Sequence, residues 1–258
     1  MGKGRIFIGT AGWSIASRHA TGFPGSGSHL ERYAAQLSCV EINSSFYRPH
    51  RRETYERWAA SVPDDFRFSV KLPKTVTHAG SLAGMDALLD GFLEGVSGLG
   101  GKLALVLVQL PPKLACDPDT AANFFRLLSG MTDAAIAVEP RHASWFGREP
   151  ETMLQECRVA RVGADPPRAA GADQPGGWNG LRYFRLHGSP SIYRSDYGPE
   201  RLAAIAAQVG SEPSGETWCI FDNTTGGHAV ANALTLGRLL RSEPAERLEG
   251  SGVAGDAA

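Results

Sequence analysis

The sequence has little cysteine and no excess of charge of either sign. Its four cysteines are Cys39, Cys116, Cys157 and Cys219. They form no Cys-x-x-Cys pair, so neither a disulfide framework nor a zinc knuckle is indicated. The formal net charge is −1, which argues against a strongly basic binder of nucleic acid or of an anionic membrane surface. Since no signal-peptide pattern or membrane-length apolar run occurs either, we expect a reduced, cytoplasmic protein with no membrane partner.

The chain does contain a regular alternation of short apolar runs with amphipathic stretches. Its 258 residues are close to the length of one (β/α)₈ barrel. Most gaps between the apolar runs show helical i, i+3, i+4, i+7 spacing, and this alternation is typical of a parallel sheet. The predicted strands are 5–9, 39–43, 66–71, 103–109, 135–139, 159–164, 181–186 and 218–221.

Two of the predicted helices have specific start signals. Ser28 and Glu31 have the spacing of a capping box. Asp117 followed by Pro118 fits an N-cap with proline at the first helical position. The other helices are predicted from spacing alone, around residues 55–62, 85–96, 153–154, 202–209 and 229–240.

These elements predict one domain. No Gly-x-Gly-x-x-Gly motif follows the first strand, which weakens the dinucleotide-binding alternative. Residues 166–180 are rich in Pro, Gly and Ala and predict an irregular loop. We therefore expect a single α/β (β/α)₈ TIM-type barrel over residues 1–241, slightly irregular around the sixth βα unit. Residues 242–258 are predicted to be a disordered tail.

Polar and ionisable residues cluster where the apolar runs stop. In a barrel, the carboxyl ends of the strands and the loops after them carry the active site. Side chains two apart on a strand share a face, so neighbouring polar residues of this kind can point inward together. We predict a polar rim made of Glu41, Asn43, Lys71, His78, Gln109, Glu139, Arg141, His142, Arg185, His187, Asp222 and Asn223.

Seven ordered motifs in the sequence resemble one known family, the YecE-like proteins or "domain of unknown function 72". They lie at residues 9–13, 40–47, 68–78, 109–112, 138–145, 185–188 and 221–227. The resemblance extends over about residues 6–240 and implies a TIM-barrel fold. It carries no established activity with it. The family commonly has an Asn-Asn pair where this sequence has Asp222-Asn223, and the extra carboxylate alters the local charge.

The rim predicts an enzyme that binds an anionic or phosphorylated small molecule or a nucleotide-like ligand. Lys71, Arg141, Arg185 and the loop 223–227 would hold the anion, since arginine suits carboxylate and phosphate groups and loops after the last strands often bind phosphate. The predicted catalytic residues are Glu41, Glu139 and His187. The other rim residues are predicted to bind substrate. In the alternative interpretation, Arg141 and Arg185 bind no ligand and only pair with carboxylates inside the barrel.

Two other functions fit the same residues. The first is a metal-dependent phosphodiester hydrolase. No compact metal motif occurs, so no cofactor is predicted, but a divalent metal would have the ligands Glu41, Glu139, His187 and Asp222. The second is a non-catalytic nucleic-acid binder, in which loop aromatic residues stack on bases. The aromatic residues are Trp13, Phe46, Tyr47, Trp145, Tyr193 and Tyr197. Their alternative role is to cover the barrel mouth.

Overall fold

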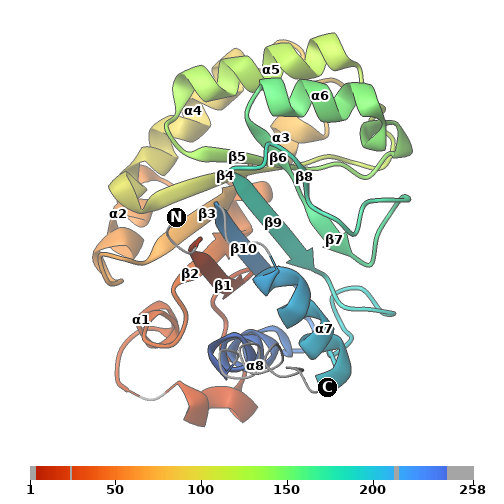
Figure 1. The fold of residues 1–258 in the computed structure, drawn as a ribbon. Helices are drawn as coiled ribbons and strands as arrows, with labels where there is room; N and C mark the ends of the chain where they lie inside the picture. The colour runs from red at the N-terminus through yellow and green to blue at the C-terminus, as the bar shows by residue number, and fades with distance from the viewer. Residues whose placement is uncertain (1–3, 24, 212–214, 243–258) are drawn as a thin grey trace, which may run out of the picture.

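Two sheets of mainly parallel strands form the centre of the molecule (Figure 1). The computed structural model describes residues 4–23, 25–211 and 215–242. One sheet has the order β1 (Ile6–Thr10), β10 (Glu216–Phe221), β9 (Leu181–Leu186) and β7 (Gly163–Asp165). The other has the order β2 (Cys39–Ile42), β3 (Arg67–Lys71), β4 (Leu103–Gln109), β5 (Ala135–Glu139), β6 (Val159–Arg161) and β8 (Gly176–Gly177). Among the described strands, only β8 pairs antiparallel, with β6.

The two sheets approach each other at both edges. The sixth predicted strand is divided at Val162, whose amide donates to the Val138 carbonyl of β5, so that β6 belongs to one sheet and β7 to the other. At the opposite edge, Ala11 forms an isolated parallel bridge with Glu41. No continuous ladder joins the sheets within the described residues. The structure is thus a mixed α/β fold with parallel sheets, and the closed barrel stays a prediction.

Helices cover the outer faces of the sheets (Figure 1). Neighbouring helices α4, α5 and α6 lie outside the six-stranded sheet, whereas α8 packs on β1 and β10 and against α7. The α-helices are α1 (His29–Ala34), α2 (Arg52–Ala60), α3 (Lys74–Thr77), α4 (Asp86–Val96), α5 (Pro118–Met131), α6 (Arg148–Glu156), α7 (Pro199–Gly210) and α8 (Ala229–Ser242). Short 3₁₀ segments are η1 (Ser17–Gly22), η2 (Ser44–Phe46), η3 (Ser97–Lys102) and η4 (Ala143–Phe146).

Local sequence signals place several boundaries correctly. The Ser28 side chain accepts from the Glu31 amide while Glu31 accepts from the Ser28 amide, which confirms the capping box at α1. The Asp117 side chain caps α5 and Pro118 is its first residue. The predicted loop 166–180 contains only the two-residue strand β8. The predicted tail begins at Ser242, which is the last residue of α8; residues 243–258 lie outside the described part.

The core consists of two groups of buried apolar side chains. The larger group fills the space between the sheets and the helices. The smaller group draws on strands of both sheets and contains Phe7, Cys39, Leu105, Leu107, Ala137, Ala160, Val162, Leu181, Tyr183, Trp218 and Ile220. Because side chains alternate along a strand, the next residues on this face, toward the carboxyl ends, include Glu41, Glu139 and Arg185. The inner face is therefore apolar in its middle and ionic at one end.

None of the described helices combines the length and the apolar character that a membrane crossing requires.

The closeness of β1 and β2 predicts an asymmetric response to two glycine substitutions. A Cβ at Gly9 would collide with the Cys39 carbonyl oxygen and lie 2.8 Å from its Sγ, whereas a Cβ at Gly91 in α4 would meet nothing within 4 Å. We expect Gly9→Ala to lower the free energy of unfolding by about 1–3 kcal/mol. Gly91→Ala should raise it by up to about 1 kcal/mol because alanine favours helix. Urea unfolding measures both, and an unchanged stability of Gly9→Ala would contradict the packing described.

Candidate functional site

A fully buried arginine lies at the centre of an ion network. Arg185, in β9, has no exposed surface. Its Nε and Nη2 donate to Oε2 and Oε1 of Glu41 at 3.0 and 2.7 Å, which is a bidentate pairing. Its Nη1 donates to Oε2 of Glu139, and its Nη2 also donates to Oδ2 of Asp222 at 3.1 Å. One guanidinium therefore holds carboxylates from β2, β5 and the end of β10, across the two sheets.

Two further cations complete the network. Arg141 donates from Nε and Nη2 to Oε1 of Glu139 at 3.2 and 3.1 Å. His187 places Nε2 3.2 Å from the same oxygen and Nδ1 3.0 Å from Oδ2 of Asp222. Both ring nitrogens of His187 thus face carboxylate oxygens, an arrangement that suits the doubly protonated ring.

The charges in the network keep each other ionised. Burial alone would raise the pKa of Glu139, but the charges of Arg185, His187 and Arg141 outweigh it and hold this pKa well below its ordinary value. The pKa of Asp222 is lowered in the same way, against burial, chiefly by Arg185 and His187. Burial would lower the pKa of His187, yet Glu139 and the hydrogen bond to Asp222 raise it. The carboxylates around His187 therefore favour its protonated form.

Two members of the network, Tyr183 and Ser69, are not among the residues predicted from the sequence. The hydroxyl of Tyr183 donates to Oε2 of Glu41 at 2.7 Å and lies 3.1 Å from Oγ of Ser69. Both side chains are fully buried. Their signal was strand parity, since Tyr183 lies two residues before Arg185 and Ser69 two residues before Lys71. The Tyr183 hydroxyl adds a third hydrogen bond to the Glu41 carboxylate, beside the two from Arg185, and Glu41 is fully buried.

Lys71 differs from the other cations at this end of the molecule. It is the last residue of β3 and is 8% exposed. Its Nζ lies 4.1 Å from the centre of the Phe46 ring, and no hydrogen bond or ion pair of this nitrogen occurs among the described residues. Burial, followed by the charge of Arg185, lowers the pKa of Lys71 to about 8, against the opposing pull of the carboxylates.

Other predicted rim residues lie around the network without joining it. His78 is exposed, packs edge-on against Phe46 with ring centres 5.1 Å apart, and bonds to Thr77. Burial and the charges of Lys71 and Arg141 lower the pKa of His78. This histidine also lines a cavity of about 400 Å³ formed by the loops after β3 and β4.

Four further predicted binding residues take no part in the ion network. His142 caps η4 by accepting from the Ser144 amide. The Asn223 amide donates to the Ser195 carbonyl and to Asn232 at 3.0 and 2.8 Å. Gln109 is buried at the end of β4, in register with Glu139. Asn43 follows β2, and its Oδ1 is buried without a hydrogen-bond partner, as is Oδ1 of Asn223.

The loop aromatic residues divide between packing and exposure. Trp145 and Tyr197 are buried, and Trp13 packs edge-on against Trp58. Phe46 lies under Lys71. Tyr47 is 76% exposed and Tyr193 is 38% exposed. Covering the core is thus the role of the first three, and Tyr47 and Tyr193 face solvent.

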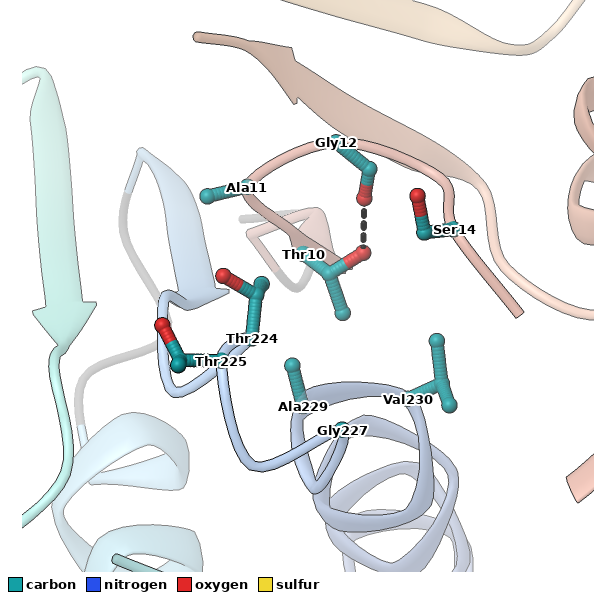
Figure 2. Close-up of a pocket in the computed structure, with 9 residues that line it drawn as sticks. All are labelled: Thr10, Ala11, Gly12, Ser14, Thr224, Thr225, Gly227, Ala229 and Val230. Atoms are coloured by element: carbon teal, nitrogen blue, oxygen red, sulfur yellow. Dashed lines mark hydrogen bonds between the residues drawn. The ribbon is translucent and has the colours of Figure 1, made fainter. Parts of the chain in front are cut away.

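A cavity of about 250 Å³ lies beside the network, between the loop after β1 and the start of α8. Figure 2 shows Thr10, Gly12 and Ser14 on one wall and Thr224, Thr225 and Gly227 on the other. Thr10 donates from its hydroxyl to the Gly12 carbonyl at 2.5 Å. Ala229 and Val230 close the cavity at the first turn of α8, whose amides have no partner within the helix.

Backbone contacts connect this cavity to the ion network from both sides. The Gly12 amide donates to the Glu41 carbonyl at 2.8 Å. On the other wall, the Thr225 amide donates to the Tyr193 carbonyl at 3.0 Å. The Tyr193 ring packs edge-on against His187, with ring centres 5.8 Å apart. The cavity and the charged cluster are therefore neighbours at the carboxyl ends of the strands.

The four predicted metal ligands do converge, but around Arg185. Glu41, Glu139 and Asp222 each direct oxygens at the guanidinium, and both nitrogens of His187 are taken by carboxylates. Within the described ranges, no group of three or more His, Cys, Asp or Glu side chains is arranged to hold a metal ion. This donor set does not fit a divalent cation without displacement of Arg185.

The fold and the site together define a class of protein. It is an α/β protein of parallel strands that contains a buried arginine–carboxylate network. The chain belongs to the family described as "Protein of unknown function DUF72", whose model matches residues 7–253. This confirms the resemblance found in the sequence motifs.

Curated relatives agree with this assignment. The chain is 31% identical over 163 residues to the UPF0759 protein YecE of Escherichia coli K12, a match covering 61% of this chain and 58% of the relative. It is 30% identical over 150 residues to the UPF0759 protein YunF of Bacillus subtilis 168, covering 55% and 52%. The matches span little more than half the length of these relatives.

Solved structures share the fold. A DUF72 family protein from Enterococcus faecalis V583 has a TM-score of 0.77 at 24% identity, covering 92% of this chain and 95% of the other. A DUF72 family protein from Thermotoga maritima MSB8 has a TM-score of 0.73 at 22% identity, covering 92% and 99%.

The central position of Arg185 predicts a large stability loss when it is removed. Arg185→Met leaves three buried carboxylates without their common partner, and removing one partner of a buried pair costs about 3–5 kcal/mol. The matched control is Arg52→Met, which removes the exposed Arg52–Glu56 pair of α2 and should cost no more than about 0.5 kcal/mol. Denaturant unfolding measures both. Equal losses would contradict the central role of Arg185.

The raised pKa of His187 predicts a specific pH dependence. A group whose pKa is higher in the folded state contributes stability that is fully present below its unfolded pKa, about 6.5, and that is lost as pH rises through the folded pKa. The stability difference between wild type and His187→Gln should therefore shrink as the solution becomes alkaline. An NMR titration of the ring, assigned with the same variant, should give a midpoint above about 6.5. A lower midpoint would contradict the charge assignment.

Proposed function

We propose that the protein is an enzyme that binds a small anionic substrate, carrying a phosphoryl or carboxylate group, at the carboxyl ends of the strands. The observation that carries this proposal is the charge arrangement. Glu41, Glu139 and Asp222 are turned inward onto Arg185, whereas the cations Lys71 and Arg141 lie at the edge of the cluster. With His187 protonated, four cations face three carboxylates, so an added anion would balance the cluster.

The proposed fold for this site is a closed (β/α)₈ barrel. Three features support closure: the Ala11–Glu41 bridge, the division of one strand between the two sheets at Val162, and the inner apolar group drawn from both sheets. In such a barrel the ionic end of the inner face is the usual place of the active site.

The proposed roles differ between the edge and the interior of the cluster. Arg141, whose side chain is 14% exposed, offers donors to an anion, and Lys71 adds a second charge. The cavity at the start of α8 supplies free backbone amides, which favour anions. Arg185 would act as a positioning residue, since its donors already serve carboxylates. Catalysis by Glu41, Glu139 and His187 stays a prediction, and their mutual pairing favours positioning roles for them too.

The alternatives make different demands on the same residues. A metal-dependent phosphodiester hydrolase would need the carboxylates that Arg185 occupies, so the geometry favours anion binding. A non-catalytic nucleic-acid binder stays a prediction that rests on Tyr47 and Tyr193, and a single-stranded oligonucleotide in the titration below would reveal it. Its affinity would fall steeply with salt.

Titration with inorganic phosphate tests the anion site. We expect Arg141→Gln to weaken binding at least about tenfold, because a hydrogen bond to a charged group contributes about 1.5–3 kcal/mol. The matched control is Arg148→Gln, an exposed arginine at the start of α6, which should leave the affinity unchanged. Calorimetry gives the affinities, and amide NMR shifts at Ala229 and Val230 report whether the cavity is occupied. Equal affinity of both variants, or no binding by the wild type, would overturn the proposal.

A further inference from the structure

Lys71 has the surroundings of a reactive amine rather than of a structural cation. Arg141, Arg185 and His187 each have a carboxylate oxygen within 3.2 Å. Among the described residues, Nζ of Lys71 has no such partner and lies over the Phe46 ring. Since Nζ has no hydrogen-bond partner and yet is not one of the completely buried polar atoms, part of its surface is in contact with solvent. A nitrogen that is reachable and unpaired can approach a ligand.

We propose that Lys71 forms an imine with the aldehyde or ketone carbonyl of a small anionic substrate. This deepens the proposed function and rests on it: the edge cation Arg141 would hold the anionic group while the Lys71 amine meets the carbonyl carbon. Burial among cations is the setting in which lysines act as nucleophiles.

Burial, followed by the charge of Arg185, favours the neutral amine that this step requires. With its pKa lowered to about 8 by burial and by Arg185, a far larger fraction of Lys71 is neutral near neutral pH than of an ordinary lysine, whose pKa is about 10.4. The other lysines in the described residues differ. Lys102 donates to two backbone carbonyls, and Lys74 and Lys113 are exposed.

The proposed step balances without an oxidant or reductant. The nitrogen lone pair forms a bond to the carbonyl carbon, and the carbonyl oxygen takes up a proton to give a carbinolamine. The carbon–oxygen bond then breaks, a second proton joins the leaving oxygen, and water departs. Nitrogen loses two protons in total, and the product is one carbon–nitrogen double bond and one water molecule.

Reductive trapping tests this inference directly. The whole protein is incubated with glyoxylate, an anionic aldehyde, and sodium cyanoborohydride, which delivers hydride to the imine carbon and makes the adduct permanent. Peptide mass spectrometry then locates the label. We expect Lys71 to be labelled at least about tenfold faster than Lys74, three residues away and exposed. We also expect propionaldehyde, which is neutral, to label Lys71 more slowly than glyoxylate does.

Two variants separate this inference from the anion site. Lys71→Arg keeps the positive charge but has no amine that becomes neutral, so it should give no label at position 71. Lys74→Arg changes an exposed residue outside the anion site, so it should retain phosphate binding and leave the labelling of Lys71 unchanged. Labelling of Lys71 no faster than that of Lys74, with normal phosphate binding, would overturn the imine while leaving the anion site intact. Absence of phosphate binding by the wild-type protein would overturn both the imine and the anion site.

Discussion

The pairing of one arginine with three carboxylates is the constraint on which the rest of the site depends. Arg185 contributes its guanidinium from β9, and its partners come from β2, β5 and the end of β10. Charges buried this deeply are stable only when they are paired and hydrogen-bonded. The positions of these strand ends are therefore coupled, because moving one of them would break a contact made by another.

This internal pairing determines which groups are left for chemistry. Once the carboxylates are directed at Arg185, the edge of the cluster is cationic, with Arg141 and Lys71 nearest to solvent. The cavity beside it is lined by hydroxyl and small apolar side chains and by glycines, with no charged side chain among the residues that line it (Figure 2). The region thus combines fixed charge with open backbone donors, a combination that suits phosphoryl or carboxylate groups.

Much of the architecture could be predicted from the sequence because it depends on local patterns. Apolar runs gave the bounds of β4, β5 and β9 to the residue, and side-chain capping placed the starts of α1 and α5. The division of the sixth strand at Val162 could not be predicted, since it depends on how two sheets meet. Tail residue Ser242 belongs to α8, where its hydroxyl donates to the Arg238 and Leu239 carbonyls of the preceding turn.

The site was predictable in its membership but not in its pairing. Strand parity brought Glu41, Glu139 and Arg185 to one face, yet only the three-dimensional structure shows that they bind each other. Parity would also have found Tyr183, had polar aromatic residues been included. The local contacts of His142 and Asn223 depend on loops that leave the strand ends, and strand patterns do not describe loops.

The most direct test of the account is a crystal structure of the protein grown with selenate, an oxyanion whose selenium gives an anomalous signal. The account predicts anomalous density within hydrogen-bonding distance of the Arg141 guanidinium and near Nζ of Lys71, with the contacts of Arg185 to its three carboxylates unchanged. Density only at sites remote from these residues, at a saturating selenate concentration, would contradict it.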